Sequence, residues 1–227
     1  MRTNLGSYRE YQVFLNYPFD DGAYEIGLSL HFAVAAAGLI PVCALDLSVP
    51  DQPRIEVLTN ALQNCKYSAH DLSRVRGEGE QNLARFNMPV ELGMALFYSF
   101  LSQRAGHRCA FLVPSPFEYR AVVSDLAGLD PFSYRNPDEI VTCTYEWLTG
   151  FKDVTDLAKA RTSEFVKECY AEFRGRLQRA SGGPNGKVSH RVFQEIIYRV
   201  CAEAGLWEWR TGPAGRIAFP EIPVPND

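Results

Sequence analysis

The chain has 227 residues, of which 46% are hydrophobic and 22% are charged, a composition typical of a globular protein with one large domain or a core domain with an appendage. Its formal net charge of -4 gives no overall attraction to nucleic acid or to an anionic membrane, so no direct nucleic-acid binding is indicated. The longest apolar stretch, residues 33–44, is too short to span a membrane, and residues 1–12 are polar without a hydrophobic signal region. These features predict a cytoplasmic protein without a membrane segment.

Short apolar runs alternate with helical patterns over the first two thirds of the chain. Strands are predicted at residues 12–15, 40–45, 66–70 and 108–113, with a further short segment at 132–134. Helices are predicted at residues 24–37, 53–64, 90–100, 117–126 and 137–148. Alternation of this kind indicates βαβ crossovers and a parallel sheet covered on both faces. We therefore expect an α/β fold, a flavodoxin-like three-layer sandwich with about five strands.

The strand pattern stops at Asp153, and two helical patterns follow at residues 157–179 and 188–204, joined by a glycine-rich turn at 181–186. Residues 207–210 and 216–219 flank a turn sequence and could form a hairpin. We predict an α/β domain over residues 1–150 and a helical C-terminal extension over 151–227. The apolar faces of the extension suggest self-association, as a homo-oligomer, or docking of a partner protein.

The six cysteines occur singly, with no Cys-x-x-Cys and no histidine at ligand spacing, at positions 43, 65, 109, 143, 169 and 201. They are predicted to be small buried side chains in a reducing compartment, so no disulfide framework and no metal site is indicated. His31 lies within an apolar helix and His190 in the C-terminal extension, and we expect neither to have a ligand partner.

Three loops follow predicted strands, at residues 16–22, 70–74 and 85–91. In a doubly wound sheet the ligand lies beyond the carboxyl ends of the strands, where these loops meet. Aromatic side chains beside Asn and Asp suit stacking on a base and hydrogen bonding to a ribose. The predicted substrate-binding residues are Asn16, Tyr17, Pro18, Phe19, Asp20, Asp71, Ser73, Arg74, Arg85, Asn87 and Met88.

Four of these residues also have a simpler interpretation. Asp20 suits a helix cap, Asp71 suits a turn, and Arg74 and Arg85 suit a solvated surface as well as they suit a pyrophosphate. His70 and Asp71 are neighbours on one strand, so their side chains point to opposite faces, and we interpret His70 as a packing residue. The P-loop, dinucleotide-binding and nucleophile-elbow motifs do not occur in the sequence.

Glu91 is the candidate catalytic residue. Asn87 can cap the predicted helix and Pro89 fits its first turn, which places Glu91 near the positive end of the helix dipole. The dipole favours an ionised carboxylate, and a fixed carboxylate at the mouth of the sheet can stabilise a developing cation. The alternative is an acidic residue that only supports its own helix.

Three segments together resemble nucleoside 2-deoxyribosyltransferase-like proteins, which share a fold superfamily with bacterial Toll/interleukin-1 receptor (TIR)-type NADases. The segments are Phe14-Leu15-Asn16-Tyr17-Pro18-Phe19, Ala69-His70-Asp71-Leu72-Ser73-Arg74 and Phe86-Asn87-Met88-Pro89-Val90-Glu91-Leu92-Gly93-Met94-Ala95. The resemblance covers residues 10–148 and implies that Glu91 is the nucleophile and that Asp71 binds base or ribose. The loop at 75–83 is longer and more charged than in the transferases, and the C-terminal extension has no counterpart there. Related effectors in antiphage defence degrade NAD.

The leaving group helps to choose between the activities that this resemblance implies. Nicotinamide leaves NAD from a cationic ring and departs neutral, so it needs no general acid, whereas a nucleoside base does. No second carboxylate has a clear claim to that role. We therefore expect an NAD glycohydrolase that uses NAD as substrate and needs no cofactor. The alternatives are a nucleoside 2-deoxyribosyltransferase or nucleoside hydrolase, and a non-catalytic nucleotide-sensing module.

Overall fold

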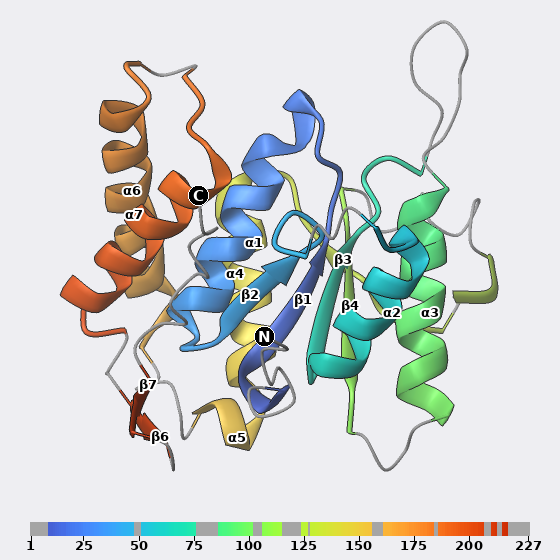
Figure 1. The fold of residues 1–227 in the computed structure, drawn as a ribbon. Helices are drawn as coiled ribbons and strands as arrows, with labels where there is room; N and C mark the ends of the chain where they lie inside the picture. Colours follow the sequence, from blue (N-terminus) through green and yellow to red (C-terminus); the bar gives the residue numbers. More distant parts are fainter. Residues whose placement is uncertain are drawn as a thin grey trace, which may run out of the picture.

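The computed structural model describes residues 9–47, 51–75, 86–101, 106–114, 124–126, 128–155, 161–183, 186–206, 210–212 and 215–217. Its centre is a five-stranded, all-parallel sheet in the order β2-β1-β3-β4-β5 (Figure 1). The strands are β1 (Gln12–Asn16), β2 (Ile40–Cys43), β3 (Tyr67–Asp71), β4 (Arg108–Val113) and β5 (Phe132–Ser133). This order is that of flavodoxin-like folds, and it confirms the predicted fold class.

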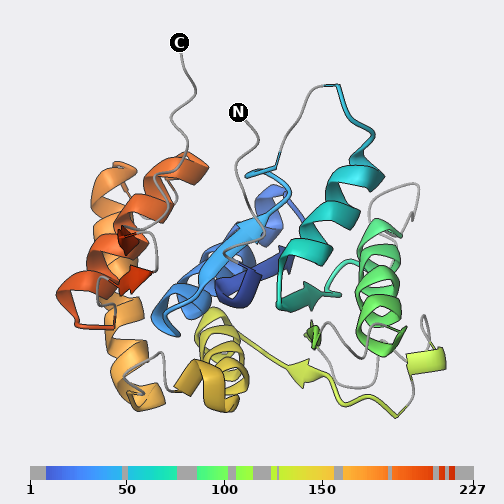
Figure 2. The same ribbon diagram turned by 60° about the horizontal axis from the view of Figure 1, so that its bottom comes forward.

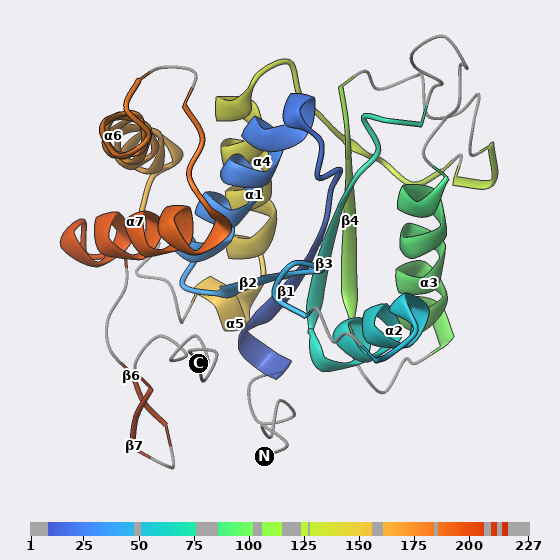
Figure 3. The ribbon, with the colours of Figure 1, turned by 45° about the horizontal axis from the view of Figure 1, so that its top comes forward.

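Helices cover both faces of the sheet. On one face, α1 (Tyr24–Ala36) packs against α4 (Pro137–Thr149), and on the other α2 (Arg54–Asn64) packs against α3 (Asn87–Leu101), as Figure 3 shows. Every residue of β1 and β3 is buried because both of their faces are covered, so the polar side chains of Ser68 and His70 in β3 are buried together with its apolar ones. Helix α1 is buried from Gly27 to Ala36, and Gly38, with φ of 74°, ends it in a left-handed conformation.

The C-terminal helices form a further layer outside α1 and α4 (Figure 2). Helix α5 (Lys152–Thr155) is short, and α6 (Ser163–Ala180) and α7 (His190–Glu203) pack on each other and on α4 and α1. Phe32 of α1 stacks on Phe173 of α6 with ring centroids 5.5 Å apart, and Ile197 of α7 is fully buried. One hydrophobic core therefore continues from the sheet's helices into the extension, and the apolar faces of α6 and α7 are used inside the molecule.

Most predicted boundaries agree with the observed ones to within a few residues, but α6 differs. It begins at Ser163 and not at residue 157, because the Thr162 side chain accepts a hydrogen bond from the Phe165 amide and caps the helix there. The predicted helix at 117–126 lies mostly outside the described residues, and its end, Ser124–Leu126, is a 3-10 turn. The strands β6 (Arg210–Gly212) and β7 (Gly215–Ile217) pair antiparallel, as the predicted hairpin requires.

No helix in the described part of the chain combines the length and apolar character that crossing a membrane would need.

Helix α4 has a side-chain cap that can be tested alone. The Asn136 side-chain oxygen accepts a hydrogen bond from the Glu139 amide at 3.0 Å and satisfies one of the unpaired donors of the first turn. We expect Asn136→Ala to lower the free energy of unfolding by about 1 kcal/mol in urea titrations. Asn64→Ala, at the last residue of α2, is the matched control and should have the smaller effect. Equal losses in the two variants would contradict a capping role.

Candidate functional site

The candidate site lies where the strand order reverses. β1 has β2 on one side and β3 on the other, so the loops after β1 and β3 leave the same edge of the sheet at the switch point. Asn16 is the last residue of β1 and Asp71 the last of β3. Two of the three predicted loops therefore meet where ligands bind in this class of fold.

Asn16 ties this edge to the start of α3. It is buried, and its side-chain amide donates a hydrogen bond to the main-chain oxygen of Met88 at 3.1 Å. The same nitrogen lies 3.0 Å from Nδ1 of His70. Met88 contributes its carbonyl here, while its side chain packs with Leu72 in a small apolar cluster. Asn16 thus positions the first turn of α3, and with it Glu91.

Glu91 is buried, with 4% of its surface exposed, and its Oε1 atom has no hydrogen-bond partner among the described residues. The sequence-based expectation of its surroundings was wrong in two respects. Helix α3 begins at Asn87, so Asn87 is a helical residue and not the cap, and Glu91 lies in the second turn. The field of the helix terminus fades beyond the first turn, and burial dominates.

Burial raises the pKa of the Glu91 carboxyl from 4.5 to about 7, and the charge of Arg54 opposes that rise. A group with this pKa is close to half protonated at neutral pH, so the expected permanently ionised carboxylate is not what the fold provides. Arg54, the first residue of α2, was not predicted as a site residue. In the sequence, the position of Arg54 at the start of a predicted helix is what could have suggested it. That this helix packs on the same face of the sheet as α3 is known from the structure.

Asp71 is fully buried and both of its carboxylate oxygens are engaged within the protein. Oδ1 accepts hydrogen bonds from the amide, at 3.0 Å, and the hydroxyl of Ser73, and Oδ2 accepts one from the Tyr134 hydroxyl at 2.6 Å. Burial raises the pKa of Asp71, and these hydrogen bonds oppose the rise. Asp71 and Ser73 therefore shape the loop after β3. Tyr134 was not predicted, although it directly follows β5 and so reaches the same edge of the sheet.

The contribution of the hydrogen bond between Tyr134 and Asp71 to the free energy of unfolding can be measured. Tyr134→Phe leaves a buried carboxylate without its donor, so we expect the free energy of unfolding near neutral pH to fall by about 2 kcal/mol. Tyr145→Phe is the control, since its hydroxyl bonds the main-chain oxygen and amide of Arg161, each at 3.0 Å, and it should cost about half as much. A smaller loss for Tyr134→Phe than for the control, in urea titrations, would count against this assignment.

The aromatic part of the first loop lies toward the C-terminal helices. Tyr17 and Phe19 meet edge to face with centroids 4.8 Å apart. With Pro18 and Asp20 they line a pocket of about 200 Å³, whose remaining walls are formed by Tyr24, Gly27, Leu28, Leu45, Val188, His190 and Phe193. The predicted loop is thus divided, with Asn16 directed to α3 and the aromatic side chains to α1 and α7.

Arg74 and Asp20 join the first two loops. Arg74 donates to Oδ1 of Asp20 at 3.1 Å, and the same Asp20 oxygen accepts the Ala23 amide at 3.1 Å, which caps a short 3-10 turn at Asp21–Ala23. The guanidinium also lies against Gly22, where any larger residue would collide with it. Asp20 therefore acts as a cap and an ion-pair partner. Asn87 is exposed, and Arg85 lies outside the described residues.

The site therefore combines a buried carboxyl group, Glu91, on a helix whose first turn Asn16 holds, with Asp71 at the end of β3 and Arg74 in the loop that follows. The aromatic pocket lies on the side of α1 and α7. A search of known family models and of curated proteins finds no match to this chain. The residues of the site and their geometry are therefore the grounds for its function.

Proposed function

We propose that the protein is an N-glycosidase that cleaves the bond between nicotinamide and ribose in NAD, with Glu91 as its catalytic carboxylate. The observation that carries the proposal is the buried Glu91, whose Oε1 has no partner among the described residues, at the switch point of the sheet. Buried carboxyl groups with raised pKa values and unused hydrogen-bonding capacity are uncommon outside functional sites.

The chemistry needs one carboxylate. When the C1′–N bond breaks, its electron pair leaves with the nicotinamide ring, which becomes neutral, and positive charge develops on C1′ and the ring oxygen of the ribose. The Glu91 carboxylate stabilises that charge where it forms. A water molecule then supplies the hydroxyl group at C1′ and releases one proton, giving ADP-ribose and nicotinamide.

The raised pKa of Glu91 suits a cationic substrate. Before binding, burial holds about half of the carboxyl groups protonated near neutral pH. The positive charge of a nicotinamide ring close to the carboxyl group would favour its ionised form, since an opposite charge within a few ångströms lowers the pKa of an acid. A neutral nucleoside gives no such help. This difference favours NAD over a nucleoside as the substrate.

The state of Asp71 also favours NAD. A nucleoside base is a poor leaving group that needs a proton, and Asp71 is the other carboxyl residue that is buried in the described part of the chain. Both of its oxygens accept hydrogen bonds from Ser73 and Tyr134, so it is poorly placed to donate to a substrate. Arg74, beside the loop, is a suitable cation for the pyrophosphate of NAD.

One observation favours a second activity. A carboxyl group that is half protonated near neutral pH can itself donate a proton to a departing base, so a nucleoside 2-deoxyribosyltransferase or nucleoside hydrolase remains the alternative. In that case, Glu91 would be expected to attack C1′ only after giving up its proton. A non-catalytic nucleotide-sensing module would bind NAD through the same loops without releasing nicotinamide.

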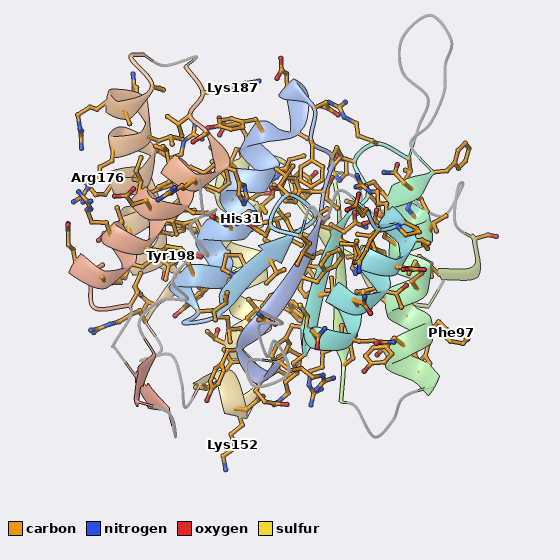
Figure 4. The ribbon with its side chains drawn as sticks, in the orientation of Figure 1. His31, Phe97, Lys152, Arg176, Lys187 and Tyr198 are labelled. Carbon is orange, nitrogen blue, oxygen red and sulfur yellow. The ribbon has the colours of Figure 1, made fainter. Side chains whose placement is uncertain are left out.

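A role as an antiphage effector in the cytoplasm, and a homo-oligomeric state or a partner bound through the C-terminal helices, belong to the same proposal. The apolar faces of α6 and α7 lie in the core, so docking there would have to use their polar sides. The exposed apolar side chains Val90, Phe97 and Phe100 lie on α3 instead, and Phe97 points away from the molecule in Figure 4.

The deciding experiment is to incubate the purified full chain, in separate reactions, with NAD and with a mixture of four deoxynucleosides, and to identify the products by mass spectrometry. Nicotinamide and ADP-ribose from NAD, with intact deoxynucleosides, support the proposal. Base exchange or free bases from the deoxynucleosides would support the alternative activity. Binding of NAD by calorimetry without any product, at high protein concentration, would point to the sensing module and overturn the enzymatic proposal.

A further inference from the structure

A second cluster of reactive side chains lies on the other side of β1 from Glu91. It is made by His31 of α1, Cys43 at the end of β2 and His190, the first residue of α7. A nitrogen of each imidazole and the cysteine sulfur lie within 4.8 Å of one another. Figure 4 labels His31, in the region where α1 and α7 meet. Because the three residues come from distant parts of the chain, their spacing in the sequence does not predict the cluster.

A carboxylate adjoins the group at His190 and Cys43. Oδ1 of Asp46 lies 2.7 Å from Nε2 of His190, and its Oδ2 accepts the amide of Cys43 at 2.8 Å. Gln194, one turn further along α7, donates to the same Oδ1 at 3.2 Å and holds the carboxylate in place. Two imidazoles, a thiol and a carboxylate are the ligands that zinc uses in proteins, and hydrogen bonds that fix a ligating carboxylate are typical of such sites.

The distances suit tetrahedral coordination. The Cys43 sulfur and Nε2 of His190 are 3.8 Å apart. Zinc–sulfur and zinc–nitrogen bonds at the tetrahedral angle place those two atoms about 3.5 Å apart, so this pair needs only a small shift. His31, whose ligand atom lies within 4.8 Å of the other two, would close the remaining distance. The Tyr17 hydroxyl lies 3.1 Å from Nε2 of His31 and 3.9 Å from the sulfur, and would have to move aside or remain as a neighbour of the ion.

Hydrogen bonding within the chain accounts for one nitrogen of each imidazole, since Nε2 of His31 meets the Tyr17 hydroxyl and Nε2 of His190 meets Asp46. Nδ1 of His31 and Nδ1 of His190 are buried without a partner among the described residues, although buried ring nitrogens are usually paired. His31 and Cys43 are fully buried, which is costly for polar groups that only fill space. Such clusters of buried, mutually close donors are more typical of ion binding than of packing.

The protonation states also fit a cation. Burial lowers the pKa of His31 to about 3, so its imidazole is neutral and able to act as a ligand. Burial alone would raise the pKa of Asp46, but hydrogen bonding to and charge from His190 hold it at about 2, so Asp46 is an anion. Burial and the Asp46 charge raise the pKa of the Cys43 thiol, so an arriving cation would displace its proton to solvent.

An ion can reach the cluster. The side chains of His190 and Asp46 are 20% and 25% exposed. The pocket of about 200 Å³ beside the first loop extends from Phe19 to His190 and Phe193. A route from solvent therefore leads to the imidazole of His190.

We propose that His31, Cys43 and His190, with Asp46 as the fourth ligand, bind one divalent transition-metal ion of the zinc type. The ion would join the N-terminus of α7 to the middle of α1 and the end of β2, and through Tyr17 it would hold the loop that follows β1. The ion takes no part in the bond cleavage proposed for Glu91. The result of a metal-binding experiment therefore does not depend on whether the protein cleaves NAD.

The test is a cobalt titration of the full chain after treatment with a chelator. Bound Co²⁺ in a site with a thiolate gives a sulfur-to-metal charge-transfer band in the near ultraviolet, together with the visible bands of tetrahedral cobalt. We expect both bands to saturate at one Co²⁺ per chain and to disappear when one equivalent of Zn²⁺ is added. Zn²⁺ should also raise the midpoint of thermal unfolding by several degrees.

Two variants and a control identify the ligands. Cys43→Ser should abolish the charge-transfer band, and His190→Ala should weaken Co²⁺ binding by at least roughly a hundredfold, as loss of a ligand does. Cys143→Ser, at a half-buried cysteine of α4, should leave both properties unchanged. His190 is at the edge of the molecule, so His190→Ala still tests the site if Cys43→Ser does not fold.

Two results would overturn the proposal. One is the absence of a charge-transfer band in the wild-type chain. The other is metal binding that both Cys43→Ser and His190→Ala retain, which would show an adventitious ion only.

Discussion

Glu91→Gln is expected to lower the rate of nicotinamide release from NAD by about four powers of ten. The amide keeps the size of the side chain but cannot carry the negative charge that stabilises the developing cation at C1′. The side chain is buried and its Oε1 has no partner among the described residues, so the exchange removes no hydrogen bond that is described for that atom. The loss should appear in kcat, with a much smaller change in KM.

The measurement is nicotinamide release followed by liquid chromatography, at several NAD concentrations and equal protein concentrations. Glu56→Gln, at an exposed glutamate in the first turn of α2, is the matched control and should keep wild-type activity. Circular dichroism of each variant establishes that the fold is retained. Wild-type kcat in a folded Glu91→Gln protein would remove Glu91 from the mechanism.

Glu91→Gln should also change how stability depends on pH. The pKa of Glu91 is raised from 4.5 to about 7 by burial, so between these values the folded chain binds a proton that the unfolded chain has released. Stability then falls as the pH rises through this range and levels off above it. A shift of this size corresponds to roughly 3 kcal/mol at high pH.

The amide cannot ionise, so this loss should be absent from the variant. Free energies of unfolding from urea titrations near pH 5 and near pH 8 should give similar values for the two proteins at the lower pH. At the higher pH the variant should be more stable by roughly 3 kcal/mol. Glu56→Gln should follow the wild type at both values. Parallel pH profiles for wild type and Glu91→Gln would mean that the Glu91 carboxyl is not held neutral by the fold. In the proposed mechanism the ionised carboxylate is the working form, so this loss of stability would be a compromise between stability and activity.

Strands β1, β2 and β4 were predictable because each is a short, mainly apolar run, whereas β3 contains Ser68, His70 and Asp71 and gives a weaker signal. The predicted boundaries of β4, Arg108 to Val113, agree with the structure to the residue, and β1 and β3 shift by one. Strands buried on both faces carry this signal in their local composition. The alternation of these runs with helical patterns then gave the parallel sheet and its fold class.

Helix ends were less predictable where a single side chain decides them. α6 begins at Ser163 because Thr162 caps it, although the charged pattern before it is also compatible with a helix. α3 begins earlier than predicted, at Asn87. That shift of a few residues moved Glu91 out of the first turn and changed its expected charge.

In the candidate site, too, some features follow from the local sequence and others depend on the tertiary structure. The loops after β1 and β3 were predicted to meet, and they do, because parallel strands end at one edge of a sheet. Tyr134 and Arg54 were missed because they reach the site from β5 and α2. No local sequence motif predicts where these two elements lie around the sheet. His31, Cys43 and His190 were missed for the same reason, since α7 meets α1 and β2 only after the chain has folded.

The sequence by itself determined the class of fold, the edge of the sheet where a ligand would bind and the choice of Glu91, because these follow from local periodicity and from residues close together in the chain. The tertiary structure decided the environment of each group. It paired Asp71 with Tyr134, directed Tyr17 toward α7, gathered two histidines around a cysteine and raised the pKa of Glu91 to about 7. Burial and long-range contacts set these properties, and both depend on which distant segments pack together.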